Sequence, residues 1–195
     1  LPSTPIHPKL LFVGQIGIRK GVDSLIDAFL QVALEIPTAQ LAIVGQRYSQ
    51  KQEAIEYERK LIHQAENSEF GNQVSWLGIR DDIADLMRLS TILIHPARQE
   101  PLGRVLLESA ASGLPIIATH VGGTPEILTS PEFDKLLVPP ESPMEIAEKV
   151  IELSTSTQKL NAIGCQLRAM AIANFSVEAC VTEIDRHYRR LLRLA

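Results

Sequence analysis

Six short apolar runs alternate with longer amphipathic stretches along the chain, and this alternation restricts the fold more than any other feature. The runs are KLLFVG (9–14), QLAIVG (40–45), QVSWLG (73–78), TILIHP (91–96), PIIATH (115–120) and KLLVPP (135–140). Near-continuous apolar runs of this length are typical of strands buried on both faces of a parallel sheet. Apolar residues recur at helical spacing in the other stretches, which are 22–35, 49–66, 82–89, 103–112, 125–128 and 142–153. The pattern predicts an α/β domain with a doubly wound, parallel, six-stranded sheet.

Both ends of the chain differ from this pattern. Two more helical stretches, 156–173 and 177–192, follow the last expected strand, and no strand separates them. We expect these extra C-terminal helices to pack outside the sheet or against something that the chain lacks. The opening LPSTPIHP has the proline-rich composition of a linker. We therefore expect a linker remnant over 1–8, a single domain over 9–195, and a longer parent protein.

Composition argues against several kinds of partner. The formal net charge of the 195 residues is −4, so no broad basic field exists to hold nucleic acid or an anionic membrane. An anionic ligand must therefore be bound locally. Cys165 and Cys180 lack the close cysteine or histidine neighbours that a zinc site or a disulfide framework needs. They predict reduced, buried thiols in a cytoplasmic protein.

A glycine-containing loop, GQIGIRKG (14–21), follows the first expected strand. Its glycine spacing differs from the GxGxxG fingerprint, which argues against a nicotinamide-binding domain. Gly14 and Gly17 allow a tight loop that brings the backbone close to a ligand. Lys20 lies where this loop meets the next helix, and there it can bind a diphosphate as a point charge. The alternative is a solvated lysine at the start of a helix.

Two acids flank the expected start of the helix over 103–112. Glu100 precedes the helix and Glu108 lies within it, while the free backbone amides at its start, around Gly103, attract an anion. Two carboxylates would repel a diphosphate, so we expect them to accept hydrogen bonds from sugar hydroxyls at its two uncharged ends. Eight helical residues span about 12 Å, which is comparable to the separation of two sugars joined by a diphosphate. The alternative is a surface pair between Arg104 and Glu108, worth about 0.3–0.5 kcal/mol.

A glycine pair, Gly122 and Gly123, follows the fifth expected strand in VGGTPE (121–126). Two interpretations of this pair stay open. Its bare backbone amides could meet a phosphate, or the pair could form a tight turn that requires unusual dihedral angles.

These stretches together carry a resemblance to a known family. In their order and spacing, they resemble the C-terminal half of retaining glycosyltransferases of the GT-B type, the group 1 or family 4 enzymes, which have two Rossmann-like halves. The likeness covers about residues 9–192. The segments that carry it are VGQIGIRKGVDSLIDAF, LAIVG, VSWLG, HPARQEPLGRVLLESAASGLPIIATHVGGTPEIL and LLVPPESPMEIAEKVIEL.

The resemblance implies a domain that binds a nucleoside diphosphate sugar, linked to UDP or GDP, for the transfer of a hexose with retention of configuration. Glu100 would contact the transferred sugar near its anomeric carbon and is the expected catalytic residue. Glu108 would bind the ribose hydroxyls, and Lys20 would neutralise the diphosphate. The other residues implied to bind the donor are Gly14, Gln15, Gly78, Ile79, Arg80, Leu102, Gly103, Arg104, Gly122 and Gly123. Of these, residues 78–80 would lie against the base, and the amides of 102–104 would meet sugar and phosphate.

The sequence also departs from the family pattern. Gln15 stands where the family usually carries Arg, and Leu102 stands where it usually carries Phe. One cationic contact to the diphosphate is therefore missing, and weaker donor affinity is expected. The resemblance implies no metal and no separate cofactor.

The half that would bind the acceptor is absent from this sequence. The expected partners are the donor and that N-terminal half, and membrane contact is expected only through the absent half. Apolar surface on the terminal helix predicts self-association of the isolated chain. The alternative function is a non-catalytic nucleotide-binding or assembly module on the same fold, with Gln15 as the sign of a lost donor contact.

Overall fold

The computed structural model describes residues 6–192. Most of the expected linker remnant therefore lies outside the described residues. His7 and Pro8 are hydrogen-bonded to the domain, because His7 Nδ1 lies 2.6 Å from Thr38 Oγ1 and the carbonyl of Pro8 accepts from the amide of Gln40.

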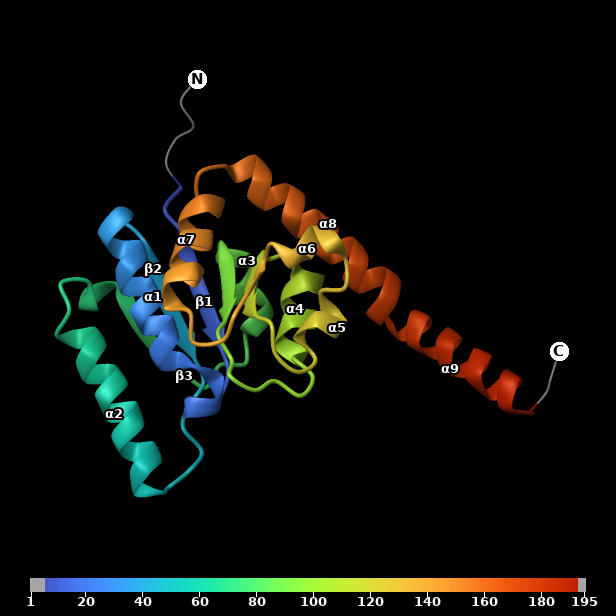
Figure 1. The fold of residues 1–195 in the computed structure, drawn as a ribbon, viewed down its shortest axis with the longest axis horizontal. Coiled ribbons are helices and arrows are strands. Elements are labelled where there is room, and N and C mark those ends of the chain that lie inside the picture. Colours follow the sequence, from blue (N-terminus) through green and yellow to red (C-terminus); the bar gives the residue numbers. More distant parts are fainter. Residues whose placement is uncertain (1–5, 193–195) are drawn as a thin grey trace.

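A six-stranded parallel sheet forms the centre of the molecule (Figure 1). The strand order is β3-β2-β1-β4-β5-β6. The strands are β1 (Lys9–Val13), β2 (Gln40–Val44), β3 (Val74–Gly78), β4 (Ile92–His95), β5 (Ile116–Thr119) and β6 (Leu137–Val138). The order runs outward from β1 in one direction and from β4 in the other, so the expected doubly wound architecture is confirmed.

Helices cover both faces of the sheet. On one face α1 (Val22–Glu35) packs against α7 (Pro143–Leu153) and against α2 (Gln52–Glu66). On the other face α4 (Arg104–Ser112) packs against α3 (Ile83–Leu89) and α8 (Thr157–Phe175). The short elements are η1 (Ile18–Lys20), η2 (Gly71–Gln73), α5 (Thr124–Ile127) and α6 (Pro131–Asp134).

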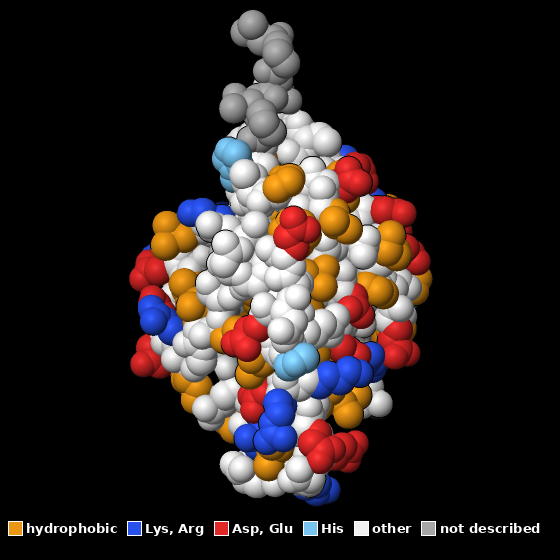
Figure 2. Space-filling view, turned by 90° about the vertical axis from the view of Figure 1, so that its left-hand side faces the viewer, with side chains coloured by type: hydrophobic (Ala, Val, Ile, Leu, Met, Phe, Trp, Pro, Cys, Tyr) orange, Lys and Arg blue, Asp and Glu red, His pale blue; other side chains and the backbone are white. Residues whose placement is uncertain are grey.

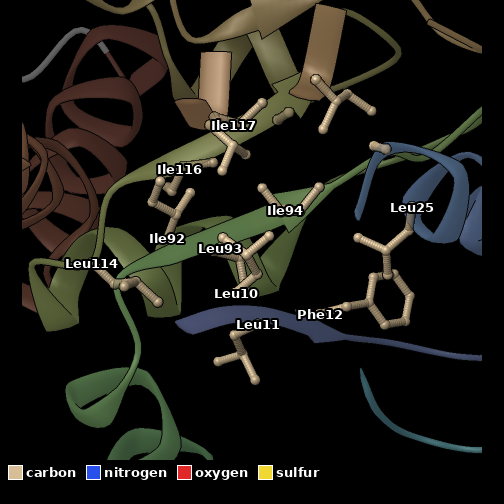
Figure 3. Packing of buried hydrophobic residues seen from close by; sticks show 14 of the residues in the cluster. Leu10, Leu11, Phe12, Leu25, Ile92, Leu93, Ile94, Leu114, Ile116 and Ile117 are labelled. Carbon is tan, nitrogen blue, oxygen red and sulfur yellow. The ribbon is translucent and has the colours of Figure 1, made fainter. Parts of the chain in front are cut away.

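The core lies between the sheet and these two helical layers. Leu11 and Phe12 of β1, Ile92 and Leu93 of β4, and Ile116 of β5 are fully buried. Figure 3 shows these side chains on neighbouring strands, with Phe12 directed toward Leu25 of α1. Because the central strands contact helices on both sides, their apolar residues run without interruption, as the sequence pattern predicts.

The terminal helix α9 (Val177–Leu192) extends away from the body of the molecule (Figure 1). None of its described residues is buried. Five apolar side chains recur along it at spacings of four and three residues, and all are more than half exposed. They are Val177, Val181, Ile184, Tyr188 and Leu191.

The last expected strand is present but only two residues long, because pairing with β5 is limited to Leu137 and Val138. Two other expectations about the elements are wrong. Strand β3 is not buried on both faces, since it forms an edge of the sheet and none of its residues is fully buried. Cys165 and Cys180 are exposed rather than buried, because Cys165 is not among the residues that α8 buries and none of the described residues of α9 is buried.

Candidate functional site

The site lies where the connections of the sheet diverge. Strands β1 and β4 are neighbours, yet the chain leaves β1 toward β2 and leaves β4 toward β5. In open α/β sheets this divergence leaves a crevice beyond the carboxyl ends of the two strands. The loops 14–21 and 96–103 meet there, at the lower edge of the sheet in Figure 1.

The first loop places Lys20 in this crevice. Residues Ile18–Lys20 form the short helix η1, and Gly21 then takes a left-handed conformation with φ of 64° before α1 begins. A Cβ atom at Gly21 would lie 2.0 Å from the carbonyl oxygen of Pro96. Gly21 is therefore needed both for its dihedral angles and for the close approach of the two loops.

The second loop places Glu100 against Lys20. The Lys20 ammonium donates to Glu100 Oε2, and His95 Nε2 lies 2.8 Å from the same oxygen. The other carboxylate oxygen, Oε1, accepts from the amide of Gly103 at 2.9 Å and makes a longer contact of 3.4 Å with the amide of Leu102. In the free chain, Glu100 thus binds both Lys20 and the amides at the start of α4, which are the groups expected to bind an anionic ligand.

These contacts determine the charge state of the acid. The hydrogen bond from His95, and then the hydrogen bond from Lys20, hold the pKa of Glu100 far below its usual range against the opposing effect of burial. Burial lowers the pKa of His95 despite its hydrogen bond to Glu100. Glu100 is therefore a carboxylate beside a neutral imidazole, so His95 Nε2 carries the proton and donates it.

The glycine pair supports the Glu100 loop from the other side. The amide of Gly123 donates to the carbonyl of Glu100 at 2.8 Å, and Gly122 has φ of 51°. A Cβ atom at Gly122 would lie 2.0 Å from the Glu100 carbonyl oxygen. This geometry matches the tight-turn interpretation, and direct contact of the pair with a phosphate stays a prediction.

A pocket of about 240 Å³ adjoins Lys20 on the side of α2. Gln15, Lys20 and Lys51 are among its lining residues. Gly14 is not among the lining residues; its amide donates to the carbonyl of Val44, and a Cβ atom at Gly45 would lie 1.9 Å from the carbonyl oxygen of Gly14. Figure 2 shows the face of the molecule that carries α1 and α2, on which acidic and basic side chains are interspersed.

The second acid of the expected pair has a different environment. Glu108 is about half exposed and lies 3.6 Å from Arg104 one helical turn earlier. It lines a hollow between α4 and the end of α8, together with Ile172 and Phe175. The structure therefore brings Lys20, Glu100 and the amides of Leu102 and Gly103 together, but it does not direct Glu108 toward them. Its contact with Arg104 fits the surface-pair alternative, and the ribose contact stays a prediction.

The loop expected to meet the base lies at the edge of the sheet. Gly78 ends β3, Ile79 is exposed, and Arg80 pairs with Asp82 at 2.6 Å. Strands β2 and β1 separate this loop from the end of β4. None of these residues contacts Glu100 or Lys20 through a hydrogen bond that the structure records.

Because His95 ends a strand near the crevice, the sequence predicts that it packs or hydrogen-bonds the neighbouring loop. The structure confirms this, since His95 is only 1% exposed and its Nε2 lies 2.8 Å from Glu100 in that loop. Arg98 is the residue at the crevice that sequence reasoning misses. Arg98 bridges the two loops through its guanidinium group. Its position two residues before an expected site acid is the signal that could have identified it.

No group of three or more histidine, cysteine, aspartate or glutamate side chains suited to a metal ion occurs within residues 6–192. None of the helices in the described part of the chain is long and apolar enough to cross a membrane.

This strand order, with a crevice where the connections diverge, is typical of α/β domains that bind nucleotides. Comparison with known proteins identifies the family. The profile of Glycosyl transferases group 1 matches residues 4–170. The chain belongs to this family, and it matches the C-terminal half of GT-B glycosyltransferases.

Two relatives illustrate the match. An uncharacterized glycosyltransferase of Methanocaldococcus jannaschii is 30% identical over 186 residues, which cover 93% of this chain and 48% of the relative. The GDP-mannose-dependent monoacylated alpha-(1-6)-phosphatidylinositol monomannoside mannosyltransferase of Corynebacterium glutamicum is 34% identical over 187 residues, which cover 91% and 46%. The chain thus spans about half the length of the curated relatives it matches.

Solved structures agree with this assignment. Anabaena HepE in complex with UDP-glucose matches with a TM-score of 0.82 and 27% identity, over 93% of this chain and 48% of that one. Sucrose-phosphate synthase from Thermosynechococcus elongatus matches with a TM-score of 0.82 and 28% identity, over 100% and 47%.

Proposed function

We propose that this chain is the donor-binding half of a retaining glycosyltransferase that transfers a hexose from a UDP- or GDP-linked sugar. The domain would comprise residues 9–195, with 1–8 as the linker to an N-terminal half that binds the acceptor. The observation that carries the proposal is the convergence of Lys20 and the Gly103 amide on one carboxylate. These groups already hold an anion in the free chain, and a diphosphate offers the same kind of oxygen to the same donors.

Donor binding then requires an exchange of anions. The diphosphate takes the Lys20 ammonium and the amides of Leu102 and Gly103, and the Glu100 carboxylate turns toward the hydroxyls of the transferred sugar. Lys20 and the start of α4 stabilise the negative charge that develops on the departing diphosphate, without a metal. In retention of configuration, the acceptor hydroxyl approaches the anomeric carbon from the face that the diphosphate leaves.

The ion pair between Lys20 and Glu100 also supports a second candidate function. Lys20 is occupied by Glu100, and Gln15 supplies no cation to assist it. A module that kept the fold for sensing or assembly, without catalysis, would tolerate this loss of donor contacts. Absence of binding to any nucleoside diphosphate at millimolar concentration would favour that module.

The ribose assignment is tested by replacing Glu108 with alanine. We expect the affinity for UDP, measured by calorimetry, to fall at least about tenfold, because a hydrogen bond to a charged acceptor contributes about 1.5–3 kcal/mol. Folding stability should hardly change, since the exposed pair with Arg104 is worth about 0.3–0.5 kcal/mol.

A matched control removes a similar surface pair elsewhere. Asp185 pairs with Arg189 one turn later on α9, at 2.7 Å and with comparable exposure. Asp185→Ala should leave UDP affinity unchanged. Unchanged affinity in Glu108→Ala as well would refute the ribose contact.

The chain alone is expected to catalyse no sugar transfer. Catalysis needs a second wall of the cleft that positions the acceptor and excludes water. The apolar stripe of α9, from Val177 to Leu191, is exposed and could contact the N-terminal half that would form this wall, or another copy of the chain. A transfer assay with simple sugar acceptors checks this expectation. Robust turnover by the isolated chain would show that one wall is enough.

A further inference from the structure

Resting on the proposed function, we infer that Arg98 is a positioning residue that holds Lys20 in the donor site. Arg98 lies in the loop after β4, two residues before Glu100, while Lys20 lies in the loop after β1. Its side chain joins its own loop to Ile18 in the loop after β1. Arg98 does not contact the proposed ligand groups itself, so it acts through the position of Lys20.

The guanidinium group of Arg98 makes four hydrogen bonds, which reach η1, α1 and the loop between β6 and α7. Its Nη1 and Nη2 atoms donate to the two carboxylate oxygens of Asp23 at 2.8 and 2.7 Å, and Nη1 also donates to the carbonyl of Ile18 at 2.8 Å. Its Nε atom donates to Glu141 at 2.8 Å. Ile18 begins η1 and Asp23 lies in the first turn of α1, so Lys20 lies between two residues held by one side chain.

Backbone and neighbouring side chains reinforce this connection. The amide of Arg98 donates to the carbonyl of Arg19 at 2.9 Å, directly before Lys20. Tyr57 of α2 donates to Asp23 at 2.9 Å, and the amide of Asp23 donates back to the Tyr57 hydroxyl at 3.2 Å. Burial alone would raise the pKa of Asp23, but the hydrogen bonds from Arg98 and Tyr57 outweigh it and lower that pKa. Asp23 is therefore ionised and retains the guanidinium near neutral pH.

The third partner carries backbone strain. Glu141 precedes α7 and has φ of 60°. It is the only non-glycine residue among 6–192 with a positive φ. Strained residues of this kind persist where surrounding contacts hold them. The hydrogen bond from Arg98 is such a contact, and it links the loop between β6 and α7 to the guanidinium group that also binds Ile18 and Asp23.

Arginine suits this position better than lysine. A planar guanidinium can bind Asp23 with two parallel bonds while its remaining hydrogens reach a carbonyl and a second acid. A lysine could satisfy only part of this set. Without the guanidinium, η1 would lose its side-chain link to the loop that carries Glu100.

The test uses Arg98→Met in the full chain, with two measurements. We expect the affinity for UDP to fall about tenfold, because a small displacement of a positioned group is enough for such a loss. We also expect the Lys20 amine to react several-fold faster in reductive methylation followed by mass spectrometry. Lys51 lines the same pocket and is exposed, so its rate should stay constant and serve as the internal control. Circular dichroism reports whether the fold is intact.

Asp23→Asn should change both measurements in the same direction, and it replaces Arg98→Met if that variant does not fold. Arg98→Lys should recover only part of the loss. Unchanged Lys20 reactivity and unchanged UDP affinity in a folded Arg98→Met protein would overturn the inference. If the unaltered chain binds no UDP but Arg98→Met still raises Lys20 reactivity, the proposed function fails while the positioning of Lys20 by Arg98 stands.

Discussion

Replacing Lys20 with methionine is expected to weaken UDP binding by about tenfold to a hundredfold while leaving the much weaker affinity for uridine unchanged. The lysine is the only cation that contacts the carboxylate of Glu100 in the described residues, and a charge-assisted hydrogen bond contributes about 1.5–3 kcal/mol. Calorimetric titration with UDP and uridine separates the contribution of the diphosphate from that of the nucleoside.

The same substitution should also reduce stability. Glu100 is 7% exposed, and removal of a buried ion-pair partner leaves a poorly compensated charge. Because His95 and the Gly103 amide remain as partners, we expect a loss of about 1–3 kcal/mol in the free energy of unfolding rather than complete unfolding.

Lys51→Met is the matched control for Lys20→Met. It removes the same charge from the same pocket, but Lys51 does not contact Glu100. We expect little change in UDP affinity or stability. Equal losses in the two variants would mean that general positive charge, and not the position of Lys20, supports binding.

The second large effect is expected for Gly21→Ala. Its Cβ atom would lie 2.0 Å from the Pro96 carbonyl oxygen, in a backbone conformation with φ of 64°. The loops that carry Lys20 and Glu100 must then move apart. We expect a loss of about 3–5 kcal/mol in the free energy of unfolding, at the upper end of the range for single substitutions, together with loss of UDP binding.

Gly78→Ala isolates the cost of the dihedral angle. Gly78 has φ of 62°, and nothing lies within 4 Å of the position that a Cβ atom would take there, so only the left-handed conformation, at about 1–2 kcal/mol, opposes the change. Urea denaturation followed by circular dichroism compares the two variants. Equal destabilisation would show that the contact between Gly21 and Pro96 does not hold the loops together.

Most of the fold could be predicted, because each helix and strand is specified by the residue pattern of its own segment. The helix expected over 22–35 is found as Val22–Glu35, and the one expected over 103–112 is found as Arg104–Ser112. Periodicity determines such elements within a few residues. The exposed cysteines could not be predicted in this way, because whether α8 and α9 are covered depends on neighbours that a local pattern does not contain.

The site could be predicted only in part, for the same reason. Sequence identified Lys20, Glu100 and the start of α4, because a lysine at a loop end and an acid before a helix are local signals. That Lys20 binds Glu100 is a contact across 80 residues, and that Arg98 binds Asp23 is a contact across 75. Neither contact follows from spacing. The four-residue spacing of Arg104 and Glu108 offered their surface pair as an alternative, but spacing alone could not decide between that pair and the ribose contact.

The central claim is that the crevice between the ends of β1 and β4 holds the diphosphate of a nucleotide sugar. A crystal structure of the chain soaked with UDP-glucose tests it most directly. We expect diphosphate oxygens within hydrogen-bond distance of Lys20 Nζ and the Gly103 amide, with Glu108 turned from Arg104 onto the ribose hydroxyls. A crystal soaked at a saturating concentration of UDP-glucose, in which Glu100 still binds Lys20 and the nucleotide is absent or bound elsewhere, would contradict this claim.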